Sequence, residues 1–377
     1  MADPADLQGL RCALVIGGLV AGGAERFVCG LARELRGRGI EVTLLAISCR
    51  QDAVGDEMAE QLREAGVRVF SGPTERIRLR SVLWYLGVMR RLRPELVHLH
   101  NLNSESAHFL AHRFLGFRYA GIRTIHSTRL ALDALSRGGF SRNPIAATVF
   151  CSEVSRQQNQ ALFRGLQVTI PNGIHFDWPL RGPETALAAK RKLGLDPDRL
   201  HFLCLGRMTG TSLAEAPKNH DTLLRAWAAA APGRGDALLH LVGDGNLRPE
   251  LELLAGADPS SLFHGVRADV RDWLLAADCF VMPSRWEGHP IAAIEALGTG
   301  LHCIFADIPP LRYLEPPSAS WCDPEDEASL ARAIVAFTRA PGYASESAVR
   351  LVRERFAIAA TAEAYLGVYA RVTEGRA

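Results

Sequence analysis

The stretch "RCALVIGGLVAGGAERFVCGLARELRGRGIEVTLLAI", residues 11–47, decides the fold class. Its opening run, 11–17, and its closing run, 41–47, are short and apolar, which indicates buried strands. Between them, Phe27, Leu31 and Leu35 are four residues apart and therefore share one face of a helix. A strand, a helix and a second strand in this order make a βαβ unit, which predicts a parallel sheet.

The same alternation continues along the chain and restarts near its middle. Apolar runs predict further strands at 67–70, 96–100, 122–126 and 147–152, and then at 200–206, 238–243, 262–266, 279–284 and 301–307. Such strands with helices between them are typical of parallel sheets that helices cover on both faces. The predicted fold class is therefore α/β, with two facing Rossmann-like domains, each a parallel sheet flanked by helices.

The domain boundary is predicted in "IPNGIHFDWPLRGPE", residues 170–184, which is rich in Pro and Gly and contains an Asn-Gly turn. This boundary gives an N-terminal domain at residues 1–176 and a C-terminal domain at 177–357. The helix predicted over 358–377 is expected to pack back on the first domain. A chain of 377 residues suits two domains of roughly 150–200 residues each.

The composition is that of a globular protein, with 48% hydrophobic and 22% charged residues. No apolar run reaches the roughly 18 residues that a spanning helix needs, and the N-terminus lacks the features of a signal peptide. Eight scattered cysteines without C-x-x-C spacing indicate reduced thiols rather than a disulfide framework or a zinc site. These features predict a cytoplasmic protein, and no nucleic-acid partner is expected.

The charge is spread unevenly along the chain. Residues 1–180 hold 22 arginines and 16 acidic residues, a net charge of +6, whereas the remainder carries −4. The segment 76–95, "RIRLRSVLWYLGVMRRLRPE", sets arginines on both sides of an apolar centre. Two interpretations stay open: a helix that binds an anionic membrane surface, or a core helix with solvated arginines at its ends.

Several chemically distinctive residues come directly after predicted strands, where open α/β sheets bind their ligands. "EGHPIAAIE", residues 287–295, contains two glutamates eight positions apart. Pro290 suits the first turn of a helix, whose backbone N–H groups can bind an anion. Glu295 then lies about 7.5 Å along the axis, the span from a diphosphate to the ribose of one nucleotide. The alternative is a pair of glutamates on the solvent-exposed surface.

The neighbouring motifs favour the nucleotide interpretation. In order along the chain they are "GGAER" (22–26), "HLHN" (98–101), "IPNGI" (170–174), "LGR" (205–207), "PKNH" (217–220), "LVGDG" (241–245) and "EGHPIAAIEAL" (287–297). With these motifs, nearly the whole chain resembles family 4 of the retaining glycosyltransferases, which have the GT-B fold. The resemblance implies an enzyme, a retaining hexosyltransferase that takes a nucleotide-sugar as its donor substrate.

The resemblance also assigns roles to matching residues. In the family, the first glutamate of the pair contacts the donor sugar and the second the ribose, which implies these roles for Glu287 and Glu295. Arg207 and Lys218 match the cations that bind the diphosphate, and His126 matches a histidine at the catalytic centre. The remaining donor-binding candidates are Gly22, Gly23, Val266, Arg267, Gly288, His289, Pro290 and Ile291. Glu25 and Asn101 are the acceptor-side candidates; the alternative for both is a structural cap.

The chain departs from the family pattern in places that bear on the donor. Ten residues separate Arg207 from Lys218, where the family has about four, and His289-Pro290 stand where many members have Phe-Gly. The implied donor is a UDP-sugar first and GDP-mannose second. The implied acceptor is a hydroxyl of a glycan or a lipid-linked glycan in polysaccharide or lipopolysaccharide biosynthesis, which would place the enzyme at the inner face of the cytoplasmic membrane.

No cofactor and no metal ion are expected, because the family generally lacks an Asp-x-Asp site and no such pair follows a strand here. The spacing of His98 and His100 puts them on one face of a strand, but no third metal ligand accompanies them. Two other functions stay open: a nucleotide-sugar 2-epimerase of the same fold, and a catalytically silent nucleotide-binding module.

Overall fold

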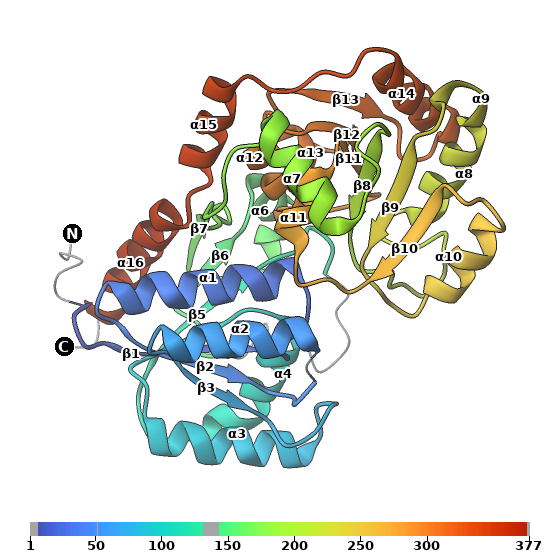
Figure 1. Cartoon of the computed structure of the whole chain (residues 1–377). Coiled ribbons are helices and arrows are strands. Elements are labelled where there is room, and N and C mark those ends of the chain that lie inside the picture. The colour runs from blue at the N-terminus through green and yellow to red at the C-terminus, as the bar shows by residue number, and fades with distance from the viewer. Residues whose placement is uncertain (1–6, 51, 131–142, 375–377) are drawn as a thin grey trace. The chain divides into compact units, whose positions relative to one another are not determined.

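The computed structural model describes residues 7–50, 52–130 and 143–374. The chain forms two compact units, one made of the residues up to His175 together with those from Phe356 onward, the other of Phe176–Arg355. Each unit is a parallel sheet with helices on both faces, so the α/β fold class predicted from the sequence is confirmed (Figure 1).

Within the described residues, the first unit holds a seven-stranded sheet in the order β3-β2-β1-β4-β5-β6-β7, and every pair of neighbours is parallel. Its strands are β1 (Arg11–Ile16), β2 (Glu41–Ala46), β3 (Arg68–Ser71), β4 (Leu96–Leu99), β5 (Ala120–Ile125), β6 (Ala147–Phe150) and β7 (Leu166–Thr169). Strand order reverses at β1, whose neighbours are β2 and β4.

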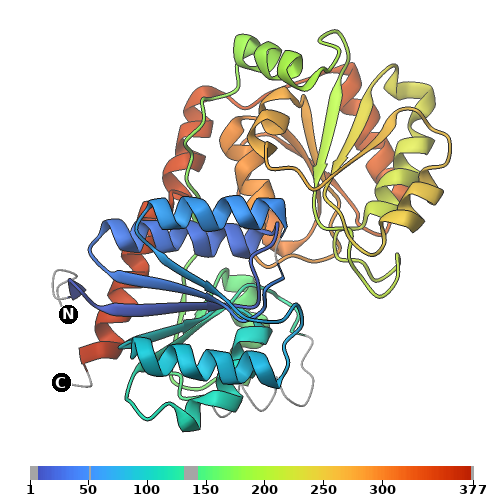
Figure 2. The same ribbon diagram turned by 60° about the horizontal axis from the view of Figure 1, so that its bottom comes forward.

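The helices of the first unit follow from the apolar pattern of the sequence. They are α1 (Gly23–Gly37), α2 (Ala53–Glu64), α3 (Leu79–Leu92), α4 (Leu102–Ala111), α6 (Glu153–Asn159), α16 (Ile358–Glu374) and the short η2 (His112–Phe114) and η3 (Gln160–Leu162). Figure 2 shows α1 and α2 on one face of the sheet and α3 on the other. Phe27, Leu31 and Leu35 are all buried, as the predicted helix face requires.

The second unit holds, among its described residues, a six-stranded parallel sheet in the order β10-β9-β8-β11-β12-β13. Its strands are β8 (His201–Leu205), β9 (Leu238–Val242), β10 (Ser261–Gly265), β11 (Cys279–Met282), β12 (His302–Ala306) and β13 (Ala319–Cys322). Its helices are α7 (Pro183–Leu193), α8 (His220–Ala229), α9 (Ala231–Arg234), α10 (Arg248–Ala255), α11 (Val270–Ala276), α12 (Ile291–Thr299), α13 (Pro309–Arg312), α14 (Glu327–Arg339) and α15 (Glu346–Arg355).

The core of the second unit lies between this sheet and the helices α8, α10 and α14. Phe202 on β8 contacts Trp227 on α8 and Phe337 on α14, with ring centroids 5.2 and 5.5 Å apart. All three side chains are buried. Burial of aromatic rings of this size contributes strongly to the favourable free energy of such a core.

The C-terminal helix α16 is tied to the first sheet by buried polar groups. The Tyr369 hydroxyl lies 2.8 Å from Nδ1 of His98, and Nε2 of His98 lies 2.8 Å from Oγ1 of Thr124. The Tyr365 hydroxyl lies 2.9 Å from the same Thr124 oxygen. Helix α16 also packs on α1 and β5. The helix therefore completes the first unit although it comes last in the chain.

Three histidines cross the second sheet as one hydrogen-bonded chain. Nε2 of His201 lies 2.7 Å from the Asp196 carbonyl oxygen, which can only accept, so this ring nitrogen donates. His201 Nδ1 then accepts from His240 Nε2 at 2.9 Å, and His240 Nδ1 accepts from His264 Nε2 at 2.9 Å. Burial lowers the pKa of His240 to about 3 and that of His264 to about 4. All three rings are therefore neutral near pH 7.

Segment 76–95 forms α3 with its flanks, and the structure divides its apolar centre between two environments. Val82, Tyr85, Val88 and Met89 are buried in the core of the first unit, as the core-helix interpretation expects for these four side chains. Leu83, in contrast, is 58% exposed. In the part of the chain that the structure describes, no helix is long and apolar enough to span a membrane.

All eight cysteines, each within the described ranges, are free, and Cys49 is exposed while the others are buried.

Candidate functional site

The predicted site residues lie at the carboxyl ends of strands in both sheets. In the second unit, the strand order reverses at β8, which has β9 and β11 as neighbours. Arg207 follows β8 and Glu287 follows β11. A reversal of this kind opens a crevice between the loops of the two strands, because their crossover helices lie on opposite faces.

Lys218 and Glu287 meet at this point. The Lys218 ammonium nitrogen lies 2.6 Å from Oε1 of Glu287, and the two side chains are 23% and 10% exposed. The stem of Lys218 lies over Gly206, where an added Cβ would come within 3.2 Å of the Lys218 Cγ. A larger residue at 206 would displace the lysine. The pair thus lies beside the carboxyl ends of β8 and β11.

Asn219 fixes the backbone next to Lys218. Its φ of 58° is left-handed, a conformation that asparagine tolerates better than most residues. Its buried side-chain amide donates to the carbonyl oxygens of Pro283 at 2.9 Å and Pro324 at 2.7 Å. The residue before α8 is therefore tied to the ends of two other strands, β11 and β13.

Arg207 is the exposed cation of the site. Its guanidinium makes no hydrogen bond or ion pair with any residue that the structure describes. The adjacent turn is tightly packed, since a Cβ at Gly243 would lie 2.0 Å from the Gly206 carbonyl oxygen. An arginine on such a rigid turn can bind an incoming anion without first breaking an ion pair.

Helix α12 begins at Ile291, four positions after Glu287. Pro290 is its N-cap, one position before the first turn predicted from the sequence, because its carbonyl accepts from Ile294 N while its ψ of 106° is extended. His289 is buried, with its ring 6.0 Å from that of Tyr313. Glu295 is only 9% exposed. Glu287 and Glu295 are therefore not surface charges, and the solvent-exposed alternative is wrong.

Gly288 and Ile291 complete the start of α12, and both are buried. The backbone around them lies at the positive end of a nine-residue helix, which favours a negatively charged ligand.

The turn after β10 carries the two residues predicted near the base. Val266 is 40% exposed, while the Arg267 guanidinium pairs with Asp269, with Nε 2.8 Å from Oδ1. Gly265 has a left-handed φ of 67°, and its carbonyl accepts from Gly243 N at 2.8 Å. The turn is thereby joined to the loop after β9.

In the first unit, Gly22 is the N-cap of α1 and Gly23 its first residue. Glu25 lies in the first turn of this helix, and its carboxylate folds back over Gly22, where an added Cβ would lie 2.1 Å from Oε2. No side chain fits at position 22 unless Glu25 moves. The glycine therefore allows close approach of backbone and carboxylate at the carboxyl end of β1.

His126 follows β5 and is stacked on His100, with ring centroids 5.5 Å apart. Its Nε2 lies 3.3 Å from His100 Nδ1, and its shielded Nδ1 has no hydrogen-bond partner among the described residues. Burial lowers the pKa of His126 to about 4. The imidazole is therefore neutral near pH 7 and can donate or accept one hydrogen bond to a ligand.

Asn101 caps a helix, which was the alternative to its predicted role on the acceptor side. Its Oδ1 accepts from Ser104 N at 2.9 Å, which starts α4. Its amide also lies against the loop after β1, because an added Cβ at Gly17 would be 3.2 Å from Nδ2. Asn101 thus lies at the carboxyl edge of the sheet beside the loop that leads to Gly22.

Two pairs of oppositely charged residues next to these sites were not predicted from the sequence. In the first unit, Glu105 and Arg123 form a buried pair, 3.3 Å apart and 2% exposed each, and Asn143 donates to Glu105 at 2.6 Å. In the second unit, Arg285 is paired with Asp221. The spacing of neither pair in the sequence predicts contact, so only the fold reveals them.

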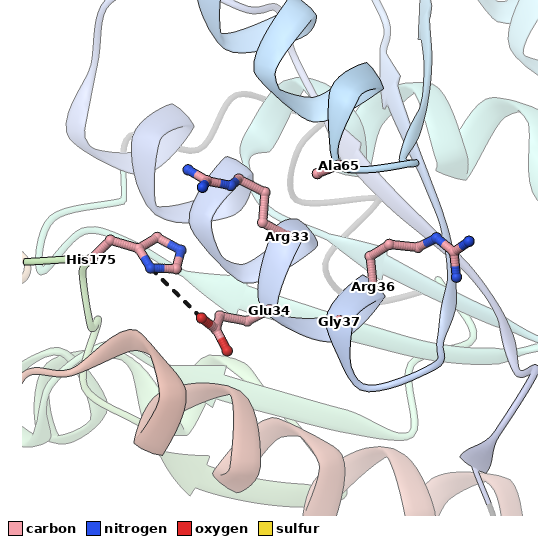
Figure 3. A pocket seen from close by; sticks show the side chains of 6 residues that line it. All are labelled: Arg33, Glu34, Arg36, Gly37, Ala65 and His175. Carbon is pink, nitrogen blue, oxygen red and sulfur yellow. Dashed lines mark ion pairs between the residues drawn. The ribbon is translucent and has the colours of Figure 1, made fainter. Parts of the chain in front are cut away.

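The structure also holds a pocket that none of the predicted residues lines. Arg33, Glu34, Arg36, Gly37, Ala65 and His175 surround it (Figure 3). Nδ1 of His175 lies 3.6 Å from Oε1 of Glu34, at the end of the first unit's main segment. The pocket belongs to the outer side of α1 rather than to the carboxyl edge of the sheet.

Family models match both units. The model described as Glycosyltransferase Family 4 matches residues 21–178, and the model described as Glycosyl transferases group 1 matches residues 199–339. The chain belongs to this family of GT-B glycosyltransferases. The resemblance seen in the sequence is thereby confirmed, and the glycosyltransferase carries its predicted site residues within both matched ranges.

Two relatives with higher identity match shorter parts of the chain. The glycosyltransferase is 42% identical over 149 residues to "UDP-Gal:alpha-D-GlcNAc-diphosphoundecaprenol alpha-1,3-galactosyltransferase" of Escherichia coli, which covers 37% of this chain and 36% of the relative. It is 35% identical over 129 residues to the lipopolysaccharide core biosynthesis mannosyltransferase LpsB of Rhizobium meliloti, covering 32% and 35%. Each alignment thus spans about a third of the relative's own length.

The fold of the glycosyltransferase is similar to that of Anabaena Alr3699/HepE, crystallised in complex with UDP-glucose. The TM-score is 0.78 at 17% identity, and the alignment covers 96% of this chain and 99% of the other.

Proposed function

We propose that this glycosyltransferase moves a hexose from a nucleotide-diphosphate sugar to a hydroxyl of a glycan or a lipid-linked acceptor, with retention of the anomeric configuration. The observation that carries the proposal is the Lys218–Glu287 pair, which sets a cation and a carboxylate beside each other where β8 and β11 diverge. A diphosphate needs the cation, and sugar hydroxyls need the carboxylate as acceptor.

The second unit offers positive charge and backbone N–H groups to the whole diphosphate. Arg207 and Lys218 supply positive charge, and the start of α12, at Gly288, His289, Pro290 and Ile291, supplies backbone dipoles. Glu287 would contact the sugar and the buried Glu295 the ribose. In the first unit, Gly22, Gly23 and His126 are the candidates for contact with a donor, through backbone and a neutral imidazole.

The proposed reaction needs no side-chain nucleophile. The acceptor hydroxyl attacks the anomeric carbon from the face on which the diphosphate leaves. The bond between that carbon and the diphosphate oxygen breaks, a new bond to the acceptor oxygen forms, and the hydroxyl proton passes to the departing diphosphate. Cations and helix dipoles that stabilise the leaving charge would then do the work of a metal ion.

UDP-sugars are the first candidate donors and GDP-mannose the second. The Escherichia coli relative is named for a UDP-sugar donor and a lipid-diphosphate acceptor, and the Rhizobium relative for mannose transfer. The Anabaena structure with a similar fold binds UDP-glucose. These names support a role in polysaccharide or lipopolysaccharide biosynthesis.

A surface of the first unit supports attachment to an anionic membrane. The α3 surface consists of the exposed apolar residues Leu79, Leu83, Leu110 and Phe114, together with the exposed arginines Arg80, Arg90, Arg91 and Arg113. Leu79, Leu83 and Arg90 follow one another at helical spacing, and Arg90 Nε donates to the Phe114 carbonyl at 2.9 Å, which joins α3 to η2. Exposed apolar side chains together with arginines suit the headgroup region of an anionic leaflet.

The test of the transfer reaction is a screen with UDP- and GDP-sugars, with and without glycan and lipid-linked acceptors, followed by product analysis. Transfer with an unchanged anomeric configuration supports the proposal. An isomerised donor would indicate the 2-epimerase instead, and binding without any product would indicate a silent nucleotide-binding module.

A further inference from the structure

One partly buried arginine joins the loop that carries Lys218 to the loop that carries Glu287. Arg285 N donates to the Pro217 carbonyl at 2.9 Å, and its Nη1 donates to the carbonyls of Ala216 at 3.1 Å and Leu213 at 3.3 Å. Arg285 lies two residues before Glu287, and Pro217 lies directly before Lys218. Arg285 therefore joins the segment before Lys218 to the segment before Glu287, through its backbone N–H and its side chain.

Arg285 is itself held in place by a carboxylate. Its Nη1 and Nη2 each lie 3.2 Å from an oxygen of Asp221, so the contact is bidentate. The side chains of Arg285 and Asp221 are 11% and 4% exposed. Burial acts to raise the pKa of Asp221, but hydrogen bonds from Arg285 and Arg225 outweigh it and lower that pKa. Asp221 is therefore ionised near pH 7.

The contacts of Arg285 favour a structural role over direct binding of the diphosphate. Nη1 and Nη2 donate to protein oxygens, and Nε lies 3.7 Å from Oε1 of Glu325. With these partners and an exposure of 11%, the guanidinium is held mainly by protein oxygens. Its effect on the site must pass through the residues that it holds.

The long connection before Lys218 explains why such an anchor is needed. Ten residues separate Arg207 from Lys218, and a loop of this length loses more conformational entropy when it is ordered than a shorter one. Its start is joined to the loop after β9, where Met208 N donates to the Asp244 carbonyl and Asn246 Nδ2 donates to the Gly210 carbonyl. Its end is joined to the loop after β11 by Arg285.

We propose that Arg285 is a positioning residue, which sets the distance between Lys218 and Glu287 by fixing residues 213–217 against the loop after β11. The proposal rests on the proposed function of that pair in binding the donor.

The test measures nucleoside diphosphate binding by isothermal titration calorimetry, with UDP and GDP as the two probes. The variants are Arg285→Ala, Lys218→Ala and the double variant. Arg225→Ala is the matched control, because Arg225 also donates to Asp221, at 2.7 Å, and its other ion pair is to Glu327 on α14. Thermal unfolding checks that each variant is folded.

We expect Arg285→Ala to raise the dissociation constant by about tenfold or more, since a misplaced binding group loses much of its effect. Arg225→Ala should stay within about twofold of wild type, a margin typical of exposed ion pairs. In the Lys218→Ala variant, the additional Arg285→Ala change should raise the dissociation constant little further, because the residue that Arg285 positions is already absent. Millimolar guanidinium should restore binding to Arg285→Ala and not to Lys218→Ala.

Three results would overturn the inference. If Lys218→Ala weakens binding while Arg285→Ala does not, Arg285 has no positioning role and the proposed donor site stands. If the Arg285 effect persists at full size without Lys218, Arg285 acts by another route, such as its charge. If Lys218→Ala binds like wild type, or if wild type binds neither nucleotide, the proposed function itself is wrong, and the inference about Arg285 falls with it. Should Arg285→Ala not fold, Arg285→Lys and Asp221→Asn take its place, with a smaller loss expected and wild-type binding contradicting the inference.

Discussion

The ammonium of Lys218 and the carboxylate of Glu287 are joined by a 2.6 Å hydrogen bond although 69 positions separate them in the chain. Each is more than three-quarters buried. An ion pair in such surroundings has lost part of its hydration. Contact with a ligand's negative charge can therefore stabilise Lys218, and contact with its hydroxyl groups can stabilise Glu287.

Removal of either member should slow sugar transfer. We expect Lys218→Ala and Glu287→Ala each to reduce turnover by about tenfold or more, because contacts to developing charge are worth roughly 3–4 kcal/mol in the transition state. Lys192→Ala is the matched control, since Lys192 forms a similar 2.8 Å pair with Asp272 but is 67% exposed on α7. Near wild-type turnover in both site variants, with folded protein by circular dichroism, would contradict the assignment.

Activity should survive removal of divalent metal ions. The proposed diphosphate site relies on Arg207, Lys218 and the start of α12. Among the described residues, no group of three or more His, Cys, Asp or Glu side chains is arranged to hold a metal ion. Turnover is measured after dialysis against EDTA and again after addition of Mg²⁺ or Mn²⁺. Complete loss with EDTA, reversed by either metal, would disprove metal independence.

Stability should fall in mild acid through the histidine chain of the second sheet. The pKa of His240 is lowered by burial from 6.5 to about 3, so the unfolded chain binds more protons than the folded chain between these values. The stabilising effect of the neutral ring is fully present above pH 6.5 and is lost as the pH falls toward 3. Thermal unfolding between pH 7.5 and 4.5 measures this loss.

His240→Gln provides the comparison for that experiment. The variant loses the one ring that both accepts from His264 and donates to His201. Its unfolding temperature should be lower than wild type at pH 7.5 but should decrease less steeply as the pH falls, because one proton fewer is taken up on unfolding. A pH dependence as steep as that of wild type would show that His240 is not among the groups responsible.

Membrane binding should depend on the α3 surface. Wild-type protein is expected to sediment with anionic liposomes, to stay in solution with neutral ones, and to dissociate as salt rises, because exposed arginines are screened over roughly 10 Å at 0.1 M salt. Combined replacement of Leu83, Arg80, Arg91 and Arg113 by Ser should abolish sedimentation. Arg90 is left unchanged because it supports Phe114.

Ser replacements of Arg332 and Arg350, which are 71% and 67% exposed on the second unit, are the matched control for charge. If wild-type protein remains in the supernatant with anionic liposomes at low salt, a water-soluble acceptor becomes the better proposal.

The local pattern of the sequence was sufficient to predict the central strands and the helix face of α1. Strands such as β1 and β8 are buried on both faces, so apolar residues fill them without interruption and are visible in the sequence. The edge strands β7 and β13 were missed. All seven residues of Leu166–Thr169 and Ala319–Trp321 are half-buried, and apolar and polar side chains are mixed among them. These strands therefore give no continuous apolar signal.

The sequence by itself determined the two α/β units and the family, because backbone periodicity and short motifs are local properties of a chain. Only the tertiary structure decided which residues meet: Tyr369 with His98, 271 positions apart, Arg285 with the carbonyls of 213–217, and Lys218 with Glu287. The contacts of Arg285 and Lys218 arise because parallel strands bring their carboxyl ends to one edge of a sheet, whatever their separation in the chain, whereas Tyr369 meets His98 because α16 packs on the first sheet. Burial, which lowers the pKa of His126, is likewise a property of packing and not of any residue alone.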